Sequence, residues 1–385
     1  MKRVLVLGGG PAGAFAAERL ASAGLETILV DEKLAWEKPC GGGLTYKAYH
    51  QYPFLIDNGT PKKVVTQARL NSAKVGTASV QLTQPLLIYS RFDLNSMLLQ
   101  RAERAGAAIE KTRVSGMERS GGKWSVRTKS GTIDADYCIV ATGARNPLRE
   151  VGTQWSPGDT MSSLGYFIPS DQDHVDLEFF PRFEGYIWIF PRAGHLSAGI
   201  AGKGKPAGEL RLMLDSYLRD KGISTRDSTY FGHVIPSLER AAWKGNRVAG
   251  DGWMAVGDAA GLVDPVTGEG LYYAMRSADL ATGTLLRTAP EAAAGSYREH
   301  VWREFGEDLS TGARLSKRLF HGEFLRNDMS ARMIQLMRRS PTVLSVVQDL
   351  FAGTQEYTTL KARLKSGLHR TAWEIALSVL PRRTA

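Results

Sequence analysis

The motif Gly8-x-Gly10-x-x-Gly13 constrains the fold of this chain more than any other feature of its 385 residues. It lies between an apolar run at residues 2–7 and an alanine-rich run at residues 14–23, and a second apolar run follows. These patterns predict a strand, a helix and another strand within about 30 residues. Because such a crossover is right-handed, we expect the two strands to be parallel neighbours in one sheet.

A phosphate-binding turn is expected at this motif. Gly8 allows the tight turn, Gly10 lets the backbone approach a pyrophosphate, and Gly13 lets the helix pack on the strand. The first N–H groups of the helix and its dipole then attract the phosphates. Asp31 stands 18 residues after Gly13, where a carboxylate can bind a ribose diol. Together these residues predict the binding of a dinucleotide cofactor.

Two later strands also end in small or acidic residues. Thr142 and Gly143 follow a strand predicted over Ile133–Val140, and Asp258 follows a strand predicted over Trp253–Val256. We expect the Asp258 carboxylate to bind the ribityl or pyrophosphate part of a flavin.

A helix predicted over Leu271–Ala281 begins directly after Gly268 and Gly270. Small residues at a helix start would let its N–H groups approach the pyrimidine of a flavin, where negative charge collects on reduction. Another helix is predicted over Phe92–Ala105, with Asp93 as its N-terminal cap.

The pattern changes between Gly152 and Val248. Alternating, aromatic-rich runs predict an antiparallel sheet with one solvated face, interrupted by a single helix at about residues 209–221. These runs are Val175–Phe180, Tyr186–Phe190, Leu196–Ala201 and Thr229–Ile235. From about Leu271 the pattern is helical to the end of the chain.

The predicted fold class is α/β, with a Rossmann-type FAD-binding domain, an inserted antiparallel β-sheet substrate domain and a C-terminal helical region. The first part of the FAD-binding domain is expected over residues 1–150, with residues 51–88 contributing to the substrate domain. The remaining predicted parts are the substrate-binding sheet domain at 151–246, the second part of the FAD-binding domain at 247–288 and the C-terminal helical region at 289–385.

Composition and charge narrow the class of protein. Two cysteines cannot form a disulfide framework, so a reducing compartment is expected. No apolar run reaches the roughly 18 residues of a membrane span, and the N-terminus does not resemble a signal peptide. The net charge is +10, and most of the excess lies beyond residue 286. A solvated helical face accounts for this charge, and a phosphorylated substrate or an anionic membrane surface would also fit it, whereas no nucleic-acid module is present.

The set of glycine motifs resembles the FAD-dependent enzymes of the p-hydroxybenzoate hydroxylase fold. Within that fold, the segment Lys38–Leu44, which contains Cys40-Gly41-Gly42, and the strand Gly185–Pro191 resemble the geranylgeranyl reductase family. That family pairs a Cys-Gly-Gly segment with a Tyr-x-Trp-x-Phe-Pro strand. The resemblance covers about residues 1–285 and implies FAD as the cofactor.

The resemblance also implies roles for individual residues. Arg91 stands where this fold usually places an arginine close to the cofactor, and Cys40 would lie at the flavin near the reacting carbon. Flavin hydroxylases of the fold often have Asp-Gly where this chain has Thr142-Gly143, so the electron donor stays open between NAD(P)H and another reductant. The implied cofactor-binding residues are Gly8, Gly10, Gly13, Asp31, Cys40, Gly41, Gly42, Arg91, Thr142, Gly143, Asp258, Gly268 and Gly270.

Several residues have two interpretations. Cys40 is either a proton donor at the flavin or a small buried residue beside a glycine turn, and Lys38 is either a local electrostatic partner or solvated. Tyr186, Trp188 and Phe190 alternate, so they lie on one face of a strand. That face either packs the core or walls a substrate pocket, and the resemblance favours the pocket.

The resemblance implies an FAD-dependent reductase of carbon–carbon double bonds in an isoprenoid or other apolar substrate. Hydride would come from reduced flavin N5, and a protein or solvent acid would protonate the other carbon, with Cys40 and Tyr186 as catalytic candidates. The alternative is a flavin-dependent monooxygenase or halogenase acting on an aromatic substrate, for which Lys74 is the halogenase lysine candidate. A flavin-bound electron carrier or scaffold is a third alternative. No histidine has metal-ligand spacing, so no metal is expected.

The C-terminal quarter contains helical apolar stripes. These are Met329, Met333, Leu336 and Met337, then Leu344, Val347 and Leu350, and finally Trp373, Ala376, Leu377 and Leu380, with Arg382 and Arg383 behind. The helices either cover the sheet or line the substrate entrance, or they form an amphipathic membrane contact. The expected location is cytoplasmic, with a peripheral membrane association as an option.

Overall fold

The computed structural model describes residues 2–324 and 327–366 and divides the chain into two compact units. Unit 1 comprises residues 1–38, 90–160 and 234–310, and unit 2 comprises residues 39–89, 161–233 and 311–385. The chain passes from unit 1 into unit 2 directly before Pro39. The FAD-binding and substrate-binding roles of the predicted domains stay predictions.

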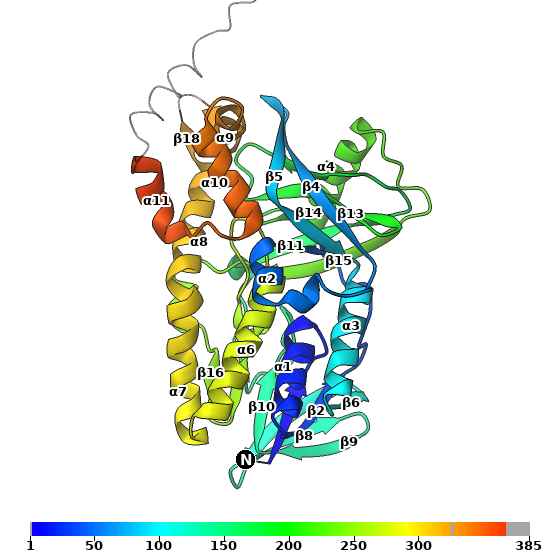
Figure 1. Cartoon of the computed structure of the whole chain (residues 1–385), viewed down its shortest axis with the longest axis vertical. Coiled ribbons are helices and arrows are strands. Elements are labelled where there is room, and N and C mark those ends of the chain that lie inside the picture. The colour runs from blue at the N-terminus through cyan, green and yellow to red at the C-terminus, as the bar shows by residue number, and fades with distance from the viewer. Residues whose placement is uncertain (1, 325–326, 367–385) are drawn as a thin grey trace, which may run out of the picture. The chain divides into compact units, whose positions relative to one another are not determined.

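Unit 1 is built on a six-stranded sheet with the order β16-β17-β10-β1-β2-β6, in which only the short edge pair β16-β17 is antiparallel. Figure 1 labels β16, β10, β2 and β6 of this sheet. The predicted parallel neighbours at the N-terminus are confirmed as β1 and β2, in register from Arg3–Glu26 to Leu7–Val30. The strands are β1 Arg3–Leu7, β2 Glu26–Asp31, β6 Ala108–Lys111, β10 Tyr137–Val140, β16 Ala249–Gly250 and β17 Trp253–Ala255.

Helices cover this sheet, and α1 packs against α3 and α6. Proline at the first position and buried alanines along one side let α1 lie close to its neighbours. A separate antiparallel sheet contains β7 Val114–Ser120, β8 Lys123–Thr128 and β9 Gly131–Ala135. The longer helices are α1 Pro11–Ser22, α3 Arg91–Arg104, α6 Leu271–Arg287 and α7 Pro290–Val301. The short ones are α5 Ala242–Gly245, η2 Pro157–Asp159, η3 Gly257–Ala260 and the π-helical turn η4 Trp302–Gly306.

Two details of the predictions for unit 1 are wrong. The single strand expected over Ile133–Val140 is two strands of different sheets, β9 and β10, which separate at Asp136. The Asp136 carboxylate accepts hydrogen bonds from the backbone N–H groups of Lys2 and Arg3, so it ends one strand and aligns the next beside β1. The cap of α3 is Ser90 rather than Asp93, since the Ser90 hydroxyl accepts the Asp93 N–H at 3.2 Å.

Unit 2 contains an eight-stranded sheet with the order β15-β11-β14-β13-β12-β4-β5-β3. The pair β12-β4 is parallel, which differs from the antiparallel sheet that the sequence predicts. The strands are β3 Gly43–Leu44, β4 Lys62–Ser72, β5 Gly76–Tyr89, β11 Thr160–Ile168, β12 Val175–Phe179, β13 Gly185–Arg192, β14 His195–Gly202 and β15 Thr229–Pro236.

Helices of unit 2 lie on both faces of its sheet. Helix α4 buries Leu210, Leu214 and Leu218 against the face that carries Ile187 and Ile189. The chain is not helical throughout after α6, because the short hairpin of β18 Glu323–Phe324 and β19 Asn327–Asp328 interrupts it. The helices are α2 Tyr46–Gln51, η1 Pro53–Leu55, α4 Ala207–Asp220, α9 Met329–Met337, α10 Pro341–Ala352 and α11 Tyr357–Ser366, and α8 Glu307–His321 enters unit 2 from unit 1.

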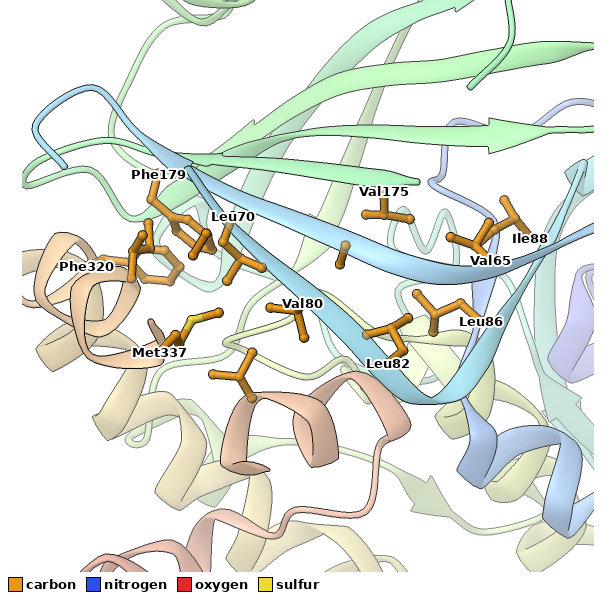
Figure 2. Close-up of a cluster of buried hydrophobic side chains, with 14 residues drawn as sticks. Val65, Leu70, Val80, Leu82, Leu86, Ile88, Val175, Phe179, Phe320 and Met337 are labelled. Carbon is orange, nitrogen blue, oxygen red and sulfur yellow. The ribbon is translucent and has the colours of Figure 1, made fainter. Parts of the chain in front are cut away.

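The opposite face of this sheet packs on an apolar cluster, shown in Figure 2. Val80 and Leu82 of β5 alternate with exposed polar residues and point toward α9 and α10, as expected for a half-buried strand. Phe179 of β12 stacks on Phe320 of α8 with ring centroids 6.3 Å apart. Met337 and Val347, from two of the predicted C-terminal stripes, belong to this cluster, so those stripes cover the sheet of unit 2.

The third C-terminal stripe, at residues 373–380, and the two arginines behind it lie outside the described residues. Among the residues that are described, every helix is too short or too polar to cross a membrane.

Candidate functional site

The glycines of the N-terminal turn have two different structural roles. A Cβ atom on Gly13 would lie 1.8 Å from the Gly8 carbonyl oxygen, and one on Gly8 would lie 2.3 Å from the Ala141 oxygen. These two positions therefore need glycine for packing of the chain on itself. Gly10, the residue before α1, has open space around its Cβ position. Of the three glycines of the motif, only Gly10 leaves room for a bound group such as a pyrophosphate.

Asp31 lies at the end of β2 and is fixed beside this turn. Its Oδ2 accepts the Gly9 N–H at 2.8 Å, and its Oδ1 accepts the N–H groups of Lys33 and Leu34 at 2.7 Å. Oδ1 thus uses both of its lone pairs, whereas Oδ2 has a further one. The carboxylate is therefore preoriented next to the glycine turn and can still accept a hydrogen bond from a ribose at Oδ2.

Arg91 begins α3, and its side chain is almost fully buried. Glu37 accepts hydrogen bonds from the Ser90 hydroxyl at 2.7 Å and from the Arg91 N–H at 2.8 Å, which fixes the start of the helix. The Arg91 guanidinium reaches Asn95 Oδ1 at 3.4 Å, but its Nε has no hydrogen-bond partner within the described part of the chain. Since a buried donor without an acceptor is costly, this atom fits an acceptor on a bound cofactor.

Asp258, in η3 directly after β17, forms an ion pair with Lys38 at 3.2 Å. Both side chains are about one-fifth exposed, at 21% and 19%. Lys38 is thus an electrostatic partner rather than a solvated charge. The Lys38 amine also lies 4.0 Å from the Cβ position of Gly143, which has a φ of +78°. Thr142 before it donates to Asn146 Oδ1 at 3.1 Å.

The turn before α6 lies close to Asp258. Gly268 has a φ of +70°, and a Cβ atom on Gly270 would lie 3.6 Å from Asp258 Oδ1. Glu269 accepts the Tyr272 N–H at 2.8 Å and so caps the helix from within the turn. Sequence reasoning overlooked Glu269 and Glu37, because a capping carboxylate has no spacing signature when it binds through a loop.

The predicted cofactor residues outside the Cys40 segment therefore all belong to unit 1, and their geometry fits FAD. The open position at Gly10, the preoriented Asp31 carboxylate and the buried Arg91 Nε each leave an unused contact. These contacts would bind the pyrophosphate, a ribose and a further acceptor of the cofactor. Their individual roles stay predictions.

Cys40 and its glycines belong to unit 2, where they pack against the aromatic strand β13. A Cβ atom on Gly41 or Gly43 would lie 3.2 or 2.9 Å from the Phe190 ring. Gly42 has a φ of +87°, and its Cβ position is 2.1 Å from the Tyr89 oxygen. The partly buried Cys40 accepts the Gly42 N–H on its sulfur at 3.3 Å. The glycines of this motif are thus required by close packing.

The three aromatic residues of β13 share one face, as predicted. Trp188 is 5% exposed and lies over Gly199 of β14, and its Nε1 donates to the Ser197 hydroxyl at 3.4 Å. Tyr186 and Phe190 are partly buried and pack against the apolar cluster of Figure 2. Whether they also wall a pocket stays a prediction.

Two residues beside Cys40 were not among the site residues predicted from the sequence. The Arg192 guanidinium donates to the Cys40 and Gly41 carbonyl oxygens, and the Ser197 hydroxyl donates to the Cys40 oxygen at 2.8 Å. A basic residue directly after the Phe190-Pro191 pair was the available signal, but sequence spacing does not reveal its partner.

Lys74, the halogenase candidate, lies in the turn between β4 and β5. Its side chain is 49% exposed and forms an ion pair with Asp328, which is buried. A lysine in a surface turn that is engaged by a carboxylate does not match the lysine of a halogenase tunnel.

Residues 2–154 match the family model described as pyridine nucleotide-disulphide oxidoreductase. The chloroplastic geranylgeranyl diphosphate reductase of Arabidopsis thaliana is 28% identical over 309 residues, which are 71% of this chain and 63% of the plant protein. This chain thus matches less than two thirds of that relative's length. Digeranylgeranylglycerophospholipid reductase 2 of Methanothermobacter thermautotrophicus is 26% identical, covering 90% of this chain and 99% of the relative.

Solved structures agree on the fold. A geranylgeranyl bacteriochlorophyll reductase-like protein of Thermoplasma acidophilum superposes with a TM-score of 0.76 at 22% identity, over 95% of this chain and 99% of that one. A flavin-dependent brominase superposes with a TM-score of 0.69 at 15% identity, over the same shares of the two chains. The predicted α/β fold class and FAD as the cofactor are confirmed. The relatives are named reductases, and this chain is similar to geranylgeranyl reductases over most of its length.

Proposed function

We propose that this protein reduces carbon–carbon double bonds of an isoprenoid or another extended apolar substrate. The observation that supports this best is the packing of the two family motifs on each other within unit 2. Phe190 of the aromatic strand lies against Gly41 and Gly43, and Arg192 at its end donates to the Cys40 carbonyl. The names of the relatives, which concern geranylgeranyl compounds, support the same substrate class.

The apolar character of this region favours a hydrocarbon substrate. Tyr186 and Phe190 keep part of their surface exposed while their rings pack on the cluster of Figure 2. Aromatic side chains supply large apolar area in a fixed orientation, which suits a prenyl chain better than a small polar substrate. A diphosphate head group would need basic residues beside this apolar region.

FAD supplies the hydride for this reaction when it is bound and reduced. The residues of the chain must then hold the alkene in one orientation and deliver a proton to the second carbon. The Cys40 thiol is our first candidate for that proton, and the Tyr186 hydroxyl is the second. After transfer, the acid regains its proton from solvent, so one hydride and one proton are added for each double bond.

Anaerobic photoreduction of the holoprotein tests the proposal. The reduced protein is mixed with geranylgeranyl diphosphate without oxygen, and flavin absorbance near 450 nm is followed together with the mass of the product. We expect reoxidation of the flavin and a mass increase of about two hydrogens per reduced bond. Reoxidation that strictly needs oxygen would instead favour the monooxygenase or halogenase alternative, which the exposed, ion-paired Lys74 does not support.

We also propose an anionic membrane surface as a partner that presents the substrate. The basic excess beyond residue 286 and the apolar stripe at residues 373–380 are the reasons, and both come from the sequence.

The electron donor is either NAD(P)H or another reductant. The same assay distinguishes them when each candidate donor, instead of light, is used to reduce the flavin.

A further inference from the structure

Arg192 is the largest fully buried side chain of the described residues, with 0% exposure. Arginine is rarely buried to this extent unless its charge is used. Its guanidinium donates to the backbone oxygens of Cys40 and Gly41, the latter at 3.3 Å, and lies over the Phe167 ring at 5.1 Å. A buried cation thus holds two consecutive carbonyl groups of the Cys-Gly-Gly segment.

A second donor comes from the same hairpin. Arg192 ends β13 and pairs with His195 at the start of β14, so the turn between the strands contains only two residues. Ser197 follows two residues later, and its hydroxyl donates to the Cys40 oxygen at 2.8 Å. The hairpin therefore delivers both donors to one carbonyl group.

The other side of the segment is fixed by β5. The Tyr89 N–H donates to the Gly42 oxygen at 2.9 Å, and Gly42 has no room for a side chain beside Tyr89. Because the Cys40 sulfur accepts the Gly42 N–H, the direction of the thiol depends on the backbone of this turn. Movement of the Cys40 carbonyl would therefore change the orientation of the thiol.

We propose that Arg192 and Ser197 are positioning residues, which hold the Cys40 carbonyl and thereby fix the direction of the Cys40 thiol. Neither residue needs to touch the substrate. This inference rests on the proposed function only where it concerns catalysis, since the orientation of the thiol can be measured without turnover.

The first experiment measures the rate at which iodoacetamide alkylates Cys40 in the FAD-loaded protein. The other thiol, Cys138, is 0% exposed and serves as an internal unreactive reference. We expect Ser197→Ala and Arg192→Lys to change the rate at least about fivefold while FAD occupancy stays constant. Arg211→Lys is the matched control, because that arginine stacks on Tyr230 at 4.9 Å on the surface of α4. Rates within twofold of the wild type in Ser197→Ala would overturn the proposal, even if Arg192→Lys fails to fold.

The second experiment is a double-mutant cycle on single-turnover flavin reoxidation by geranylgeranyl diphosphate. We expect each positioning variant to lower the rate about tenfold with an unchanged half-saturating substrate concentration. In a Cys40→Ser background the same substitutions should have no further effect, because they act through the thiol. Losses that multiply would contradict this. If Cys40→Ser alone leaves the rate unchanged, the proton-donor role fails, and the alkylation rates alone decide whether the thiol is positioned.

Discussion

The two units fix their predicted site residues in different ways. In unit 1, Asp31 is held by backbone N–H groups of its own turn and of the neighbouring glycine turn. In unit 2, Cys40 is held by Arg192 and Ser197, which lie about 150 residues further along the chain. Asp31 thus depends on local backbone geometry, whereas the Cys40 segment depends on long-range packing within unit 2.

This difference has a consequence for substitutions. A local turn tolerates a change wherever its backbone leaves room, so its glycines can be separated into packing and binding positions. A segment fixed by distant strands has no such spare position, because each residue meets a partner from another strand. We therefore expect variants in unit 1 to separate stability from cofactor binding, and variants around Cys40 to separate cofactor binding from chemistry.

The largest effect is expected in the glycine turn. Gly10→Val should abolish FAD binding while the apoprotein keeps its melting temperature, because no atom lies within 4 Å of the Cβ position and the new side chain would enter the space predicted for the pyrophosphate. Gly13→Val should lower the stability as well, by about 3 kcal/mol or more, since its Cβ would overlap the Gly8 carbonyl. Flavin absorbance and thermal unfolding of both apoproteins check this. Full FAD occupancy in Gly10→Val would show that the cofactor does not bind at this turn.

A second prediction concerns Cys40. Cys40→Ser is nearly isosteric, so FAD occupancy and the melting temperature should not change. Turnover should fall by about 10²-fold or more if the thiol is the proton donor. Single-turnover reoxidation at constant substrate concentration measures this, and Tyr186→Phe provides the comparison for the second candidate acid. An unchanged rate in Cys40→Ser would leave this residue with a packing role only.

A third prediction tests the burial of a carboxyl group in unit 2. Glu178 of β12 is buried together with Asp176, and this burial raises the pKa of Glu178 to about 7 although Lys221 acts against it. The folded protein therefore binds a proton more tightly than the unfolded chain between about pH 4.5 and pH 7. Stability should fall as the pH rises through this window and level off above it.

Glu178→Gln should remove this fall. Denaturant unfolding is expected to give equal stabilities for variant and wild type near pH 4.5, and a variant more stable by up to about 3 kcal/mol at pH 8. Glu209→Gln on the exposed side of α4 is the control and should show no such pH-dependent difference. A variant that loses stability equally at every pH would mean that the pKa of Glu178 does not differ between the folded and the unfolded protein.

The smallest expected effect concerns the membrane. Arg382→Glu with Arg383→Glu should weaken binding to anionic vesicles by roughly 1 kcal/mol or more per removed cation, and salt should weaken the wild-type protein similarly. FAD occupancy should not change. Vesicle sedimentation with anionic and neutral lipids measures this, and equal binding to both lipids would contradict the membrane proposal.

Individual elements show where sequence reasoning succeeds. Parallel neighbours β1 and β2, and helices α1 and α6, follow from periodicity and from the glycines at their ends. The two long strands β4 and β5 were expected only as a contribution to the substrate domain, because their polar exposed face hides the alternation. Ser90 and Asp93 both fit the sequence rule for an N-terminal cap. Only the backbone conformation decides which of them lies at the helix start, and in the structure this is Ser90.

The sequence by itself determined the strand–helix–strand unit around the glycine turn and indicated FAD as the cofactor, because both depend on short spacings that a local turn imposes on the chain. It also placed Tyr186, Trp188 and Phe190 on one face, since alternation along a strand is a local property. Only the tertiary structure decided that Arg192 and Ser197 hold Cys40, and that Lys38 pairs with Asp258. These contacts join residues 150 or more positions apart. Sheet pairing and the packing between elements bring the donor and the acceptor together. A hydrogen bond of this kind therefore leaves no periodic pattern in the sequence.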